Sequence, residues 1–228
     1  MKNRRVVLFD AGGTLITLDH DRVRLALQYL TATLPSDDDF ERAEAGARVW
    51  ADGAIRARLS GRELWNGYFQ RLLLEAGVEE SAIARSVAAL WEANRSLGLW
   101  RKPITGAREV IAQLFAAGYR MAVVSNAEGQ VETDLQQAGF GAYWETVVDS
   151  HVVGVAKPDP RIFEIALARM NVSADAAFYV GDVPYFDVDG AAAAGMPSVL
   201  IDPHAIHGSV TNAVRVASIR ELPALLSV

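Results

Sequence analysis

The sequence predicts an α/β protein in which a parallel sheet core is interrupted by an inserted helical domain. A short apolar strand, Val6–Phe9, opens the chain, whereas residues 17–100 show helical spacing and almost no strand signal. From residue 101 onward strands and helices alternate, which is typical of parallel strands joined by right-handed crossovers. We therefore expect a discontinuous core, residues 1–16 and 101–228, with residues 17–100 as the insert.

The composition indicates a soluble globular protein, because 228 residues with 51% hydrophobic and 22% charged side chains can bury a core. The net charge of −6 argues against a nucleic-acid or anionic-membrane partner, since such partners are held by clustered Lys and Arg. The chain has no cysteine, which excludes disulfides, thiolate metal sites and cysteine nucleophiles. No apolar run is long enough to cross a bilayer, so we expect a cytoplasmic protein. The sequence does not indicate an oligomeric state.

The opening strand ends in a carboxylate. The four apolar residues Val6–Phe9 are too few for a helix but enough for a buried strand, and Asp10 follows them directly. Gly12 and Gly13 then mark a turn. Open α/β sheets bind ligands at the carboxyl ends of their strands, so Asp10 is the first candidate site residue.

The insert is expected to contain about four helices that form a small bundle. The first covers roughly residues 21–31, and Ser36 with the acidic residues after it begins the second. Ser60 and Glu63 have the spacing of a capping box, which predicts the start of a third helix that ends at Gly77. The fourth is expected over residues 81–96.

The second part of the core alternates regularly. Lys102-Pro103 interrupts the helical pattern, and Asp159-Pro160 has the cap and first-turn proline of a helix start. The predicted strands cover residues 120–124, 146–148, 177–180 and 198–201, and the predicted helices include 107–117, 130–138 and 188–194. Residues 214–226 are expected to add a short strand and a helix.

Polar residues follow several of these apolar strands. Because the carboxyl ends of parallel strands meet at one edge of a sheet, we expect their side chains to converge on one pocket. Carboxylates, a lysine and a hydroxyl are the groups that bind Mg²⁺ and a phosphoryl group. Besides Asp10, the candidates are Ser125, Asn126, Lys157, Asp182 and Asp187.

Four segments resemble the motifs of the haloacid dehalogenase-like hydrolase superfamily. The first is DAGGT at residues 10–14, and the second is VVSNA at residues 123–127. The third is VAKPDPRIF at residues 155–163, and the fourth is GDVPYFD at residues 181–187. The resemblance covers the whole core and implies a Rossmann-like sheet. A helical cap between the first and second motifs is one of the family's arrangements.

The resemblance implies a nucleophile and a metal site. Asp10 would form an aspartyl-enzyme intermediate, as carboxylates do in some phosphoryl transfers. The implied cofactor is Mg²⁺, whose ligands would be the carboxylates of Asp10 and Asp182 and the backbone carbonyl of Gly12. The implied substrate is a small phosphorylated metabolite.

The other matching residues would bind and neutralise the phosphoryl group. Ser125 and the backbone amide of Asn126 would bind its oxygens. Lys157 would stabilise their charge and that of Asp10, and Asp187 would orient Lys157 or lie in the outer shell of the metal.

One position departs from the family's pattern. Phosphatases of this family carry a general acid and base aspartate two residues after the nucleophile, where this chain has Gly12. Losing a general acid typically lowers a rate by about a hundred- to ten-thousand-fold. A weakened phosphatase would be restricted to good leaving groups or would borrow an acid from the cap. His20 is the candidate for that acid, and the alternative is that it is a solvated loop residue.

Three further interpretations remain. A haloacid dehalogenase needs no leaving-group proton, but that branch usually lacks the Gly181-Asp182 pair and uses no metal. A phosphonatase needs a cap lysine, and residues 16–100 contain none. A non-catalytic member would use the fold to bind a phosphorylated ligand or a protein partner.

Overall fold

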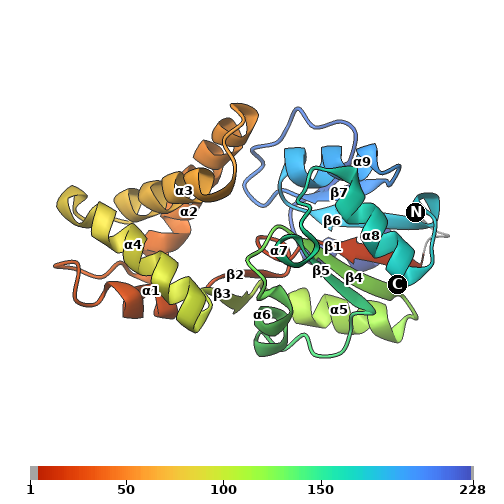
Figure 1. Ribbon diagram of the computed structural model, residues 1–228, viewed down its shortest axis with the longest axis horizontal. Coiled ribbons are helices and arrows are strands. Elements are labelled where there is room, and N and C mark those ends of the chain that lie inside the picture. The colour runs from red at the N-terminus through yellow and green to blue at the C-terminus, as the bar shows by residue number, and fades with distance from the viewer. Residues whose placement is uncertain (1–4, 227–228) are drawn as a thin grey trace. The chain divides into compact units, whose positions relative to one another are not determined.

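A six-stranded parallel sheet forms the core of the protein (Figure 1), as seen in a computed structural model that describes residues 5–226. The strand order is β5-β4-β1-β6-β7-β8. The α/β class and the Rossmann-like parallel sheet are thus confirmed. The strands are β1 (Val6–Phe9), β4 (Arg120–Ser125), β5 (Thr146–Asp149), β6 (Ala177–Gly181), β7 (Ser198–Ile201) and β8 (Val214–Val216).

Strand β1 lies in the middle of the sheet, between β4 and β6. All four of its residues are buried, which explains the continuous apolar run. After β1 the chain adds β4 and β5 on one side and then returns to add β6, β7 and β8 on the other. The strand order therefore reverses beside β1, and such a switch point is where open α/β sheets bind ligands.

Helices cover both faces of this sheet. Figure 1 shows α5 (Ala107–Ala116) and α6 (Val131–Gln137) on one side, with α8 (Pro160–Met170) and α9 (Gly190–Ala193) on the other. The helix α8 packs against alternate residues of β1, β4 and β6 in one apolar layer, as expected when every second side chain points to the same face. The remaining short helices are α7 (Ser150–Val153) and α10 (Leu222–Leu226).

The chain divides into two compact units, Met1–Thr17 with Arg101–Val228 and Leu18–Trp100. The second unit contains α1 (His20–Leu27), α2 (Asp37–Arg56), α3 (Gly61–Glu75) and α4 (Glu80–Leu97). These helices share one hydrophobic cluster of their own. The strands β2 (Ile16–Leu18) and β3 (Trp100–Pro103) pair as a separate two-stranded sheet, which the sequence analysis missed because such short strands carry no periodic signal.

The two helices predicted to begin after Ser36 and Ser60 do begin there, but only the first has a capping box. Ser36 caps α2 in a capping box with Asp39, whose Oδ2 accepts from the backbone N–H of Ser36 at 2.9 Å. The predicted capping box of Ser60 and Glu63 is wrong, because the Ser60 side chain makes no capping hydrogen bond. Gly61 follows Ser60 with φ of 56°, so the backbone leaves the serine in a different direction from that of an ordinary N-cap.

The segment predicted as a helix over residues 188–194 is also different. It is a π-helical turn, Pro184–Asp189, followed by the short helix α9. The first helix of the insert ends at Leu27 rather than near residue 31. Within residues 5–226, no helix is both long and apolar enough to cross a membrane.

Candidate active site

Asp10 lies at the carboxyl end of β1, the central strand. Its backbone N–H donates to the carbonyl of Val180 on β6 at 2.8 Å, so the sheet ladder fixes the residue at this edge. Asp10 is only 6% exposed. A carboxylate buried at this depth needs charged or hydrogen-bonding partners.

Lys157 supplies the positive partner. Its Nζ lies 2.7 Å from Asp10 Oδ1 and 2.7 Å from Asp187 Oδ1, and it donates to the hydroxyl of Tyr179 at 3.0 Å. The lysine is 4% exposed and precedes Pro158 through a cis peptide bond in the loop before α8. The structure thus brings together Asp10, Lys157 and Asp187, which lie far apart in the sequence.

The burial of these groups changes their ionisation. Burial, together with the negative charges of Asp187 and Asp182, raises the pKa of Asp10 to about 7, although the charge of Lys157 acts in the opposite direction. Burial alone would lower the pKa of Lys157, but the carboxylates of Asp10 and Asp187 raise it. The lysine therefore stays charged at neutral pH, while Asp10 is balanced between its two forms.

Three buried carboxylates could hold a metal ion. One oxygen each of Asp10, Asp182 and Asp187 lies within 4.8 Å of the others. Asp187 already uses both oxygens, since Oδ1 accepts from Lys157 and Oδ2 accepts from the backbone N–H groups of Asp182 at 3.0 Å and Val183 at 2.8 Å. Asp10 and Asp182 are therefore better placed as direct ligands, and their hard oxygen donors fit Mg²⁺.

Glycine is required where the first motif meets the fourth. Gly13 has φ of 82°, and a Cβ there would lie 2.1 Å from Asp182 Oδ2. Gly181 makes a similar close approach, with a Cβ position 2.3 Å from the Cγ of Asp187. Gly12, the predicted backbone ligand, is half-buried in the same turn. It brings no titratable group to the site.

Ser125 and Asn126 lie at the end of β4, beside β1. Ser125 is 5% exposed and ends the strand. The side chain of Asn126 binds the backbone of Lys157 twice, accepting from its N–H at 2.7 Å and donating to its carbonyl at 3.0 Å. The amide side chain of Asn126 thus fixes the Lys157 loop, an arrangement that the sequence did not indicate.

His20 lies in the other unit of the chain. It is the first residue of α1 and is 6% exposed, so the alternative that it is a solvated loop residue is wrong. Its Nδ1 lies 3.1 Å from Asp37 Oδ1, and its ring stacks on Phe40 with centroids 4.8 Å apart. Both described partners of His20 belong to the helical unit.

Sequence reasoning missed two polar residues of this site. The hydroxyl of Thr14, which is fully buried, lies 3.4 Å from Asp182 Oδ1, and the first motif could have indicated it. Tyr179 lies inside β6 and is also fully buried. In an apolar strand a tyrosine looks like a core residue, so no pattern singled it out.

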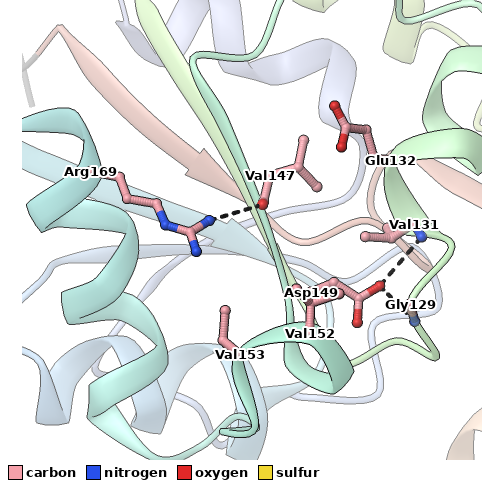
Figure 2. Close-up of a pocket in the computed structure, with 8 residues that line it drawn as sticks. All are labelled: Gly129, Val131, Glu132, Val147, Asp149, Val152, Val153 and Arg169. Carbon is pink, nitrogen blue, oxygen red and sulfur yellow. Dashed lines mark hydrogen bonds between the residues drawn. The ribbon is translucent and has the colours of Figure 1, made fainter.

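A separate pocket of about 100 Å³ lies at the end of β5 and contains none of the predicted site residues (Figure 2). Asp149 points into the turn beside it and accepts from the backbone N–H groups of Gly129 at 2.9 Å and His151 at 2.9 Å. The carboxylate is thereby used to shape the backbone. The predicted residues Lys157, Asp182 and Asp187 instead lie around Asp10.

Sequence comparisons show which family the chain resembles. The model of the haloacid dehalogenase-like hydrolase family matches residues 4–195. The human protein named haloacid dehalogenase-like hydrolase domain-containing protein 3 is 30% identical, over 92% of this chain and 87% of its own. A phosphoserine phosphatase from Thermus thermophilus is 31% identical, over 87% of this chain and 88% of its own. The matches to the frog and mouse forms of the first protein are shorter, covering 64% and 57% of those chains.

Structural comparison places the fold in the same group. The HAD-hydrolase YfnB from Bacillus subtilis, solved with magnesium bound, superposes with a TM-score of 0.70 at 23% identity and full coverage of both chains. A HAD phosphatase from Thermococcus onnurineus gives 0.64 at 21% identity over 97% of each chain. With the family match over most of its length, this chain belongs to the haloacid dehalogenase-like hydrolase family.

Proposed function

We propose that the protein is a Mg²⁺-dependent phosphatase that acts on a small phosphorylated metabolite through an aspartyl-phosphate at Asp10. The observation that carries the proposal is the buried group in which Lys157 Nζ lies 2.7 Å from both Asp10 and Asp187, with Asp182 adjacent. Groups of opposite charge held in a water-excluded site are suited to stabilising a phosphoryl transition state. Phosphatases among the relatives agree with this class of reaction.

The reaction would proceed in two displacements. In the first, the Asp10 carboxylate attacks the phosphorus, the bond to the leaving oxygen breaks, and the phosphoryl group becomes attached to Asp10. In the second, water attacks the same phosphorus, releasing orthophosphate and restoring the carboxylate. Ser125 would bind the phosphoryl oxygens in both steps, and the positive charge of Lys157 would stabilise their negative charge. Bound Mg²⁺ would supply positive charge between the Asp10 carboxylate and the phosphoryl group.

Asp187 would act through Lys157. Its Oδ1 holds the ammonium and its Oδ2 accepts two backbone N–H groups, so the carboxylate joins the lysine to the turn that carries Asp182. Such support fixes the position of the groups that contact the substrate. Asp187 is therefore a positioning residue in this proposal, while Asp10 and Ser125 contact the reacting group and Lys157 neutralises its charge.

The leaving group has no proton donor at residue 12. Gly12 offers no side chain, so the departing oxygen must leave without protonation by that residue. An aryl oxygen tolerates this, because its negative charge is stabilised by the ring, whereas an alkyl oxygen does not. We therefore propose that the enzyme favours substrates with good leaving groups.

The test is the Mg²⁺-dependent hydrolysis of an aryl phosphate and an alkyl phosphate by the wild type, Asp10→Asn and Gly12→Asp. Gly12 is not among the glycines with positive φ, so an aspartate does not strain the backbone there. We expect aryl turnover by the wild type, none by Asp10→Asn, and a gain of about a hundredfold or more on the alkyl substrate for Gly12→Asp.

Other results would change the proposal in distinct ways. Equal wild-type rates on both substrates would contradict a missing proton donor. Absence of turnover with metal bound would favour a protein that binds a phosphorylated ligand without converting it. The observation that favours this alternative is Gly12, which leaves the site without the family's general acid and base. Turnover of chloroacetate without metal would instead favour a dehalogenase.

A further inference from the structure

The hydroxyl of Tyr179 connects the site to the interior of the sheet. Tyr179 lies in the middle of β6 and is fully buried. Its hydroxyl accepts a hydrogen bond from Lys157 Nζ at 3.0 Å and donates one to the backbone carbonyl of Val124 at 2.8 Å. Val124 directly precedes Ser125, so one oxygen atom joins the lysine to the strand that carries the serine.

Packing does not explain this hydroxyl. The ring of Tyr179 belongs to the apolar layer of β1, β4, β6 and α8, and it contacts Phe163 edge-on with centroids 4.9 Å apart. A phenylalanine ring would make the same apolar contacts. The tyrosine instead places a polar oxygen in that layer, which is unfavourable unless the oxygen has partners. Both of its partners belong to the site or adjoin it.

The lysine needs a third partner. An ammonium group carries three N–H donors, and Asp10 and Asp187 accept from two of them. Tyr179 accepts from the third and also has its ring centroid 5.5 Å from Nζ. Burial and the charges of Asp187 and Asp10 raise the pKa of Tyr179 well above its usual value, so the phenol remains neutral. All three donors of Lys157 are thus directed by protein groups.

We propose that Tyr179 is a positioning residue, whose hydroxyl holds the Lys157 ammonium against Asp10 and fixes it relative to the end of β4. The inference rests on the proposed phosphatase function for its kinetic consequence, whereas its structural consequence is independent of turnover. Two carboxylates alone leave the ammonium free to shift between them, and the phenol oxygen removes that freedom. The residue is expected to act on kcat, because the alignment of the attacking carboxylate depends on the lysine.

Tyr179→Phe removes the oxygen and keeps the ring. We expect kcat for an aryl phosphate to fall by about tenfold, the effect of losing one hydrogen bond to a charged group, with KM changed less than about threefold. Tyr119→Phe is the matched control. Tyr119 is 8% exposed in the same unit, and its hydroxyl lies 3.4 Å from the carbonyl of Leu226, away from all the site residues named above. This control should keep wild-type kinetics.

A double-mutant cycle separates positioning from a general structural effect. In the Lys157→Met background, Tyr179→Phe should no longer lower kcat, because the group that it positions is absent. A further tenfold loss in that background would overturn the inference, and so would an unchanged kcat in the single variant. The cycle is measured on folded protein, as judged by circular dichroism and the unfolding midpoint.

A crystal structure of Tyr179→Phe tests the inference even if the wild type proves inactive, so failure of the two proposals can be distinguished. We expect Lys157 Nζ to move beyond hydrogen-bond distance of either Asp10 or Asp187. An ammonium that keeps both contacts in the variant would show that the hydroxyl does not position it. Wild-type inactivity with a displaced lysine would overturn the phosphatase proposal and retain this one.

Discussion

Replacing Lys157 with methionine is predicted to destabilise the core unit strongly. The substitution keeps a long unbranched side chain but removes the charge that lies 2.7 Å from two carboxylates, both of them buried. Removing one partner of a buried ion pair typically costs about 3–5 kcal/mol, because the remaining charge is left uncompensated. We expect a loss of this size in the free energy of unfolding at pH 8.

The loss should become smaller as the pH falls. Without the lysine the pKa of Asp10 rises further above about 7, since Lys157 was the group that lowered it. In the folded variant Asp10 then takes up a proton that the unfolded chain, with its ordinary pKa near 3.8, does not hold. Folding that binds protons is favoured at lower pH, so the variant should recover stability from pH 8 to pH 6.

The assay is urea unfolding at pH 6 and pH 8, with and without Mg²⁺. Lys102→Met is the matched control, because Lys102 is exposed and its substitution should change stability little. Mg²⁺ should stabilise Lys157→Met more than the wild type, since the cation then replaces a missing positive charge. A loss below about 1 kcal/mol at pH 8, or one equal to that of Lys102→Met, would refute the reasoning.

Three further outcomes follow from the structure. In the metal-free wild type between about pH 4 and pH 7, Asp10 is protonated in the folded protein but ionised in the unfolded chain. The free energy of unfolding should therefore fall as the pH rises, by up to about 1.4 kcal/mol per pH unit. Asp10→Asn should flatten this pH dependence in urea titrations. Gly13→Ala places a Cβ 2.1 Å from Asp182 Oδ2 at φ of 82° and should cost more than about 1 kcal/mol and weaken Mg²⁺ binding in calorimetry. Ser36→Ala removes the hydroxyl that accepts from Asp39 N and should cost about 1 kcal/mol in thermal unfolding, with unchanged Mg²⁺ affinity.

The sequence predicted the sheet because its signals are local and repeated. Apolar runs such as Val6–Phe9 end in polar residues, and glycines stop the helices between them, so the parallel order follows from alternation alone. The prediction of a capping box at Ser60 was wrong because Gly61 adopts a positive φ, and residue spacing does not indicate that backbone conformation. The two short strands Ile16–Leu18 and Trp100–Pro103 failed for a different reason, since their pairing joins segments about 80 residues apart.

The candidate site could also be predicted only in part. Asp10, Ser125 and Asp182 could be placed at one edge because each ends a strand or directly follows one. The bonds of Asn126 to the Lys157 backbone, and of Tyr179 to its ammonium, could not be placed, because each joins residues on separate elements. Side chains inside the sheet are chosen by packing, and a hydroxyl there leaves no periodic trace in the sequence.

The balance of charge in the site is the strongest physical argument for the proposed Mg²⁺. Asp10, Asp182 and Asp187 carry three negative charges when ionised and Lys157 carries one positive charge, so the buried group has a net charge of −2. The protein alone can reduce that charge only by protonating a carboxylate, and the raised pKa of Asp10 reflects this. A protonated Asp10 is a poor nucleophile, however, and the incoming phosphoryl group adds further negative charge. A divalent cation bound to Asp10 and Asp182 would neutralise the group and keep the nucleophile ionised, which protonation cannot do.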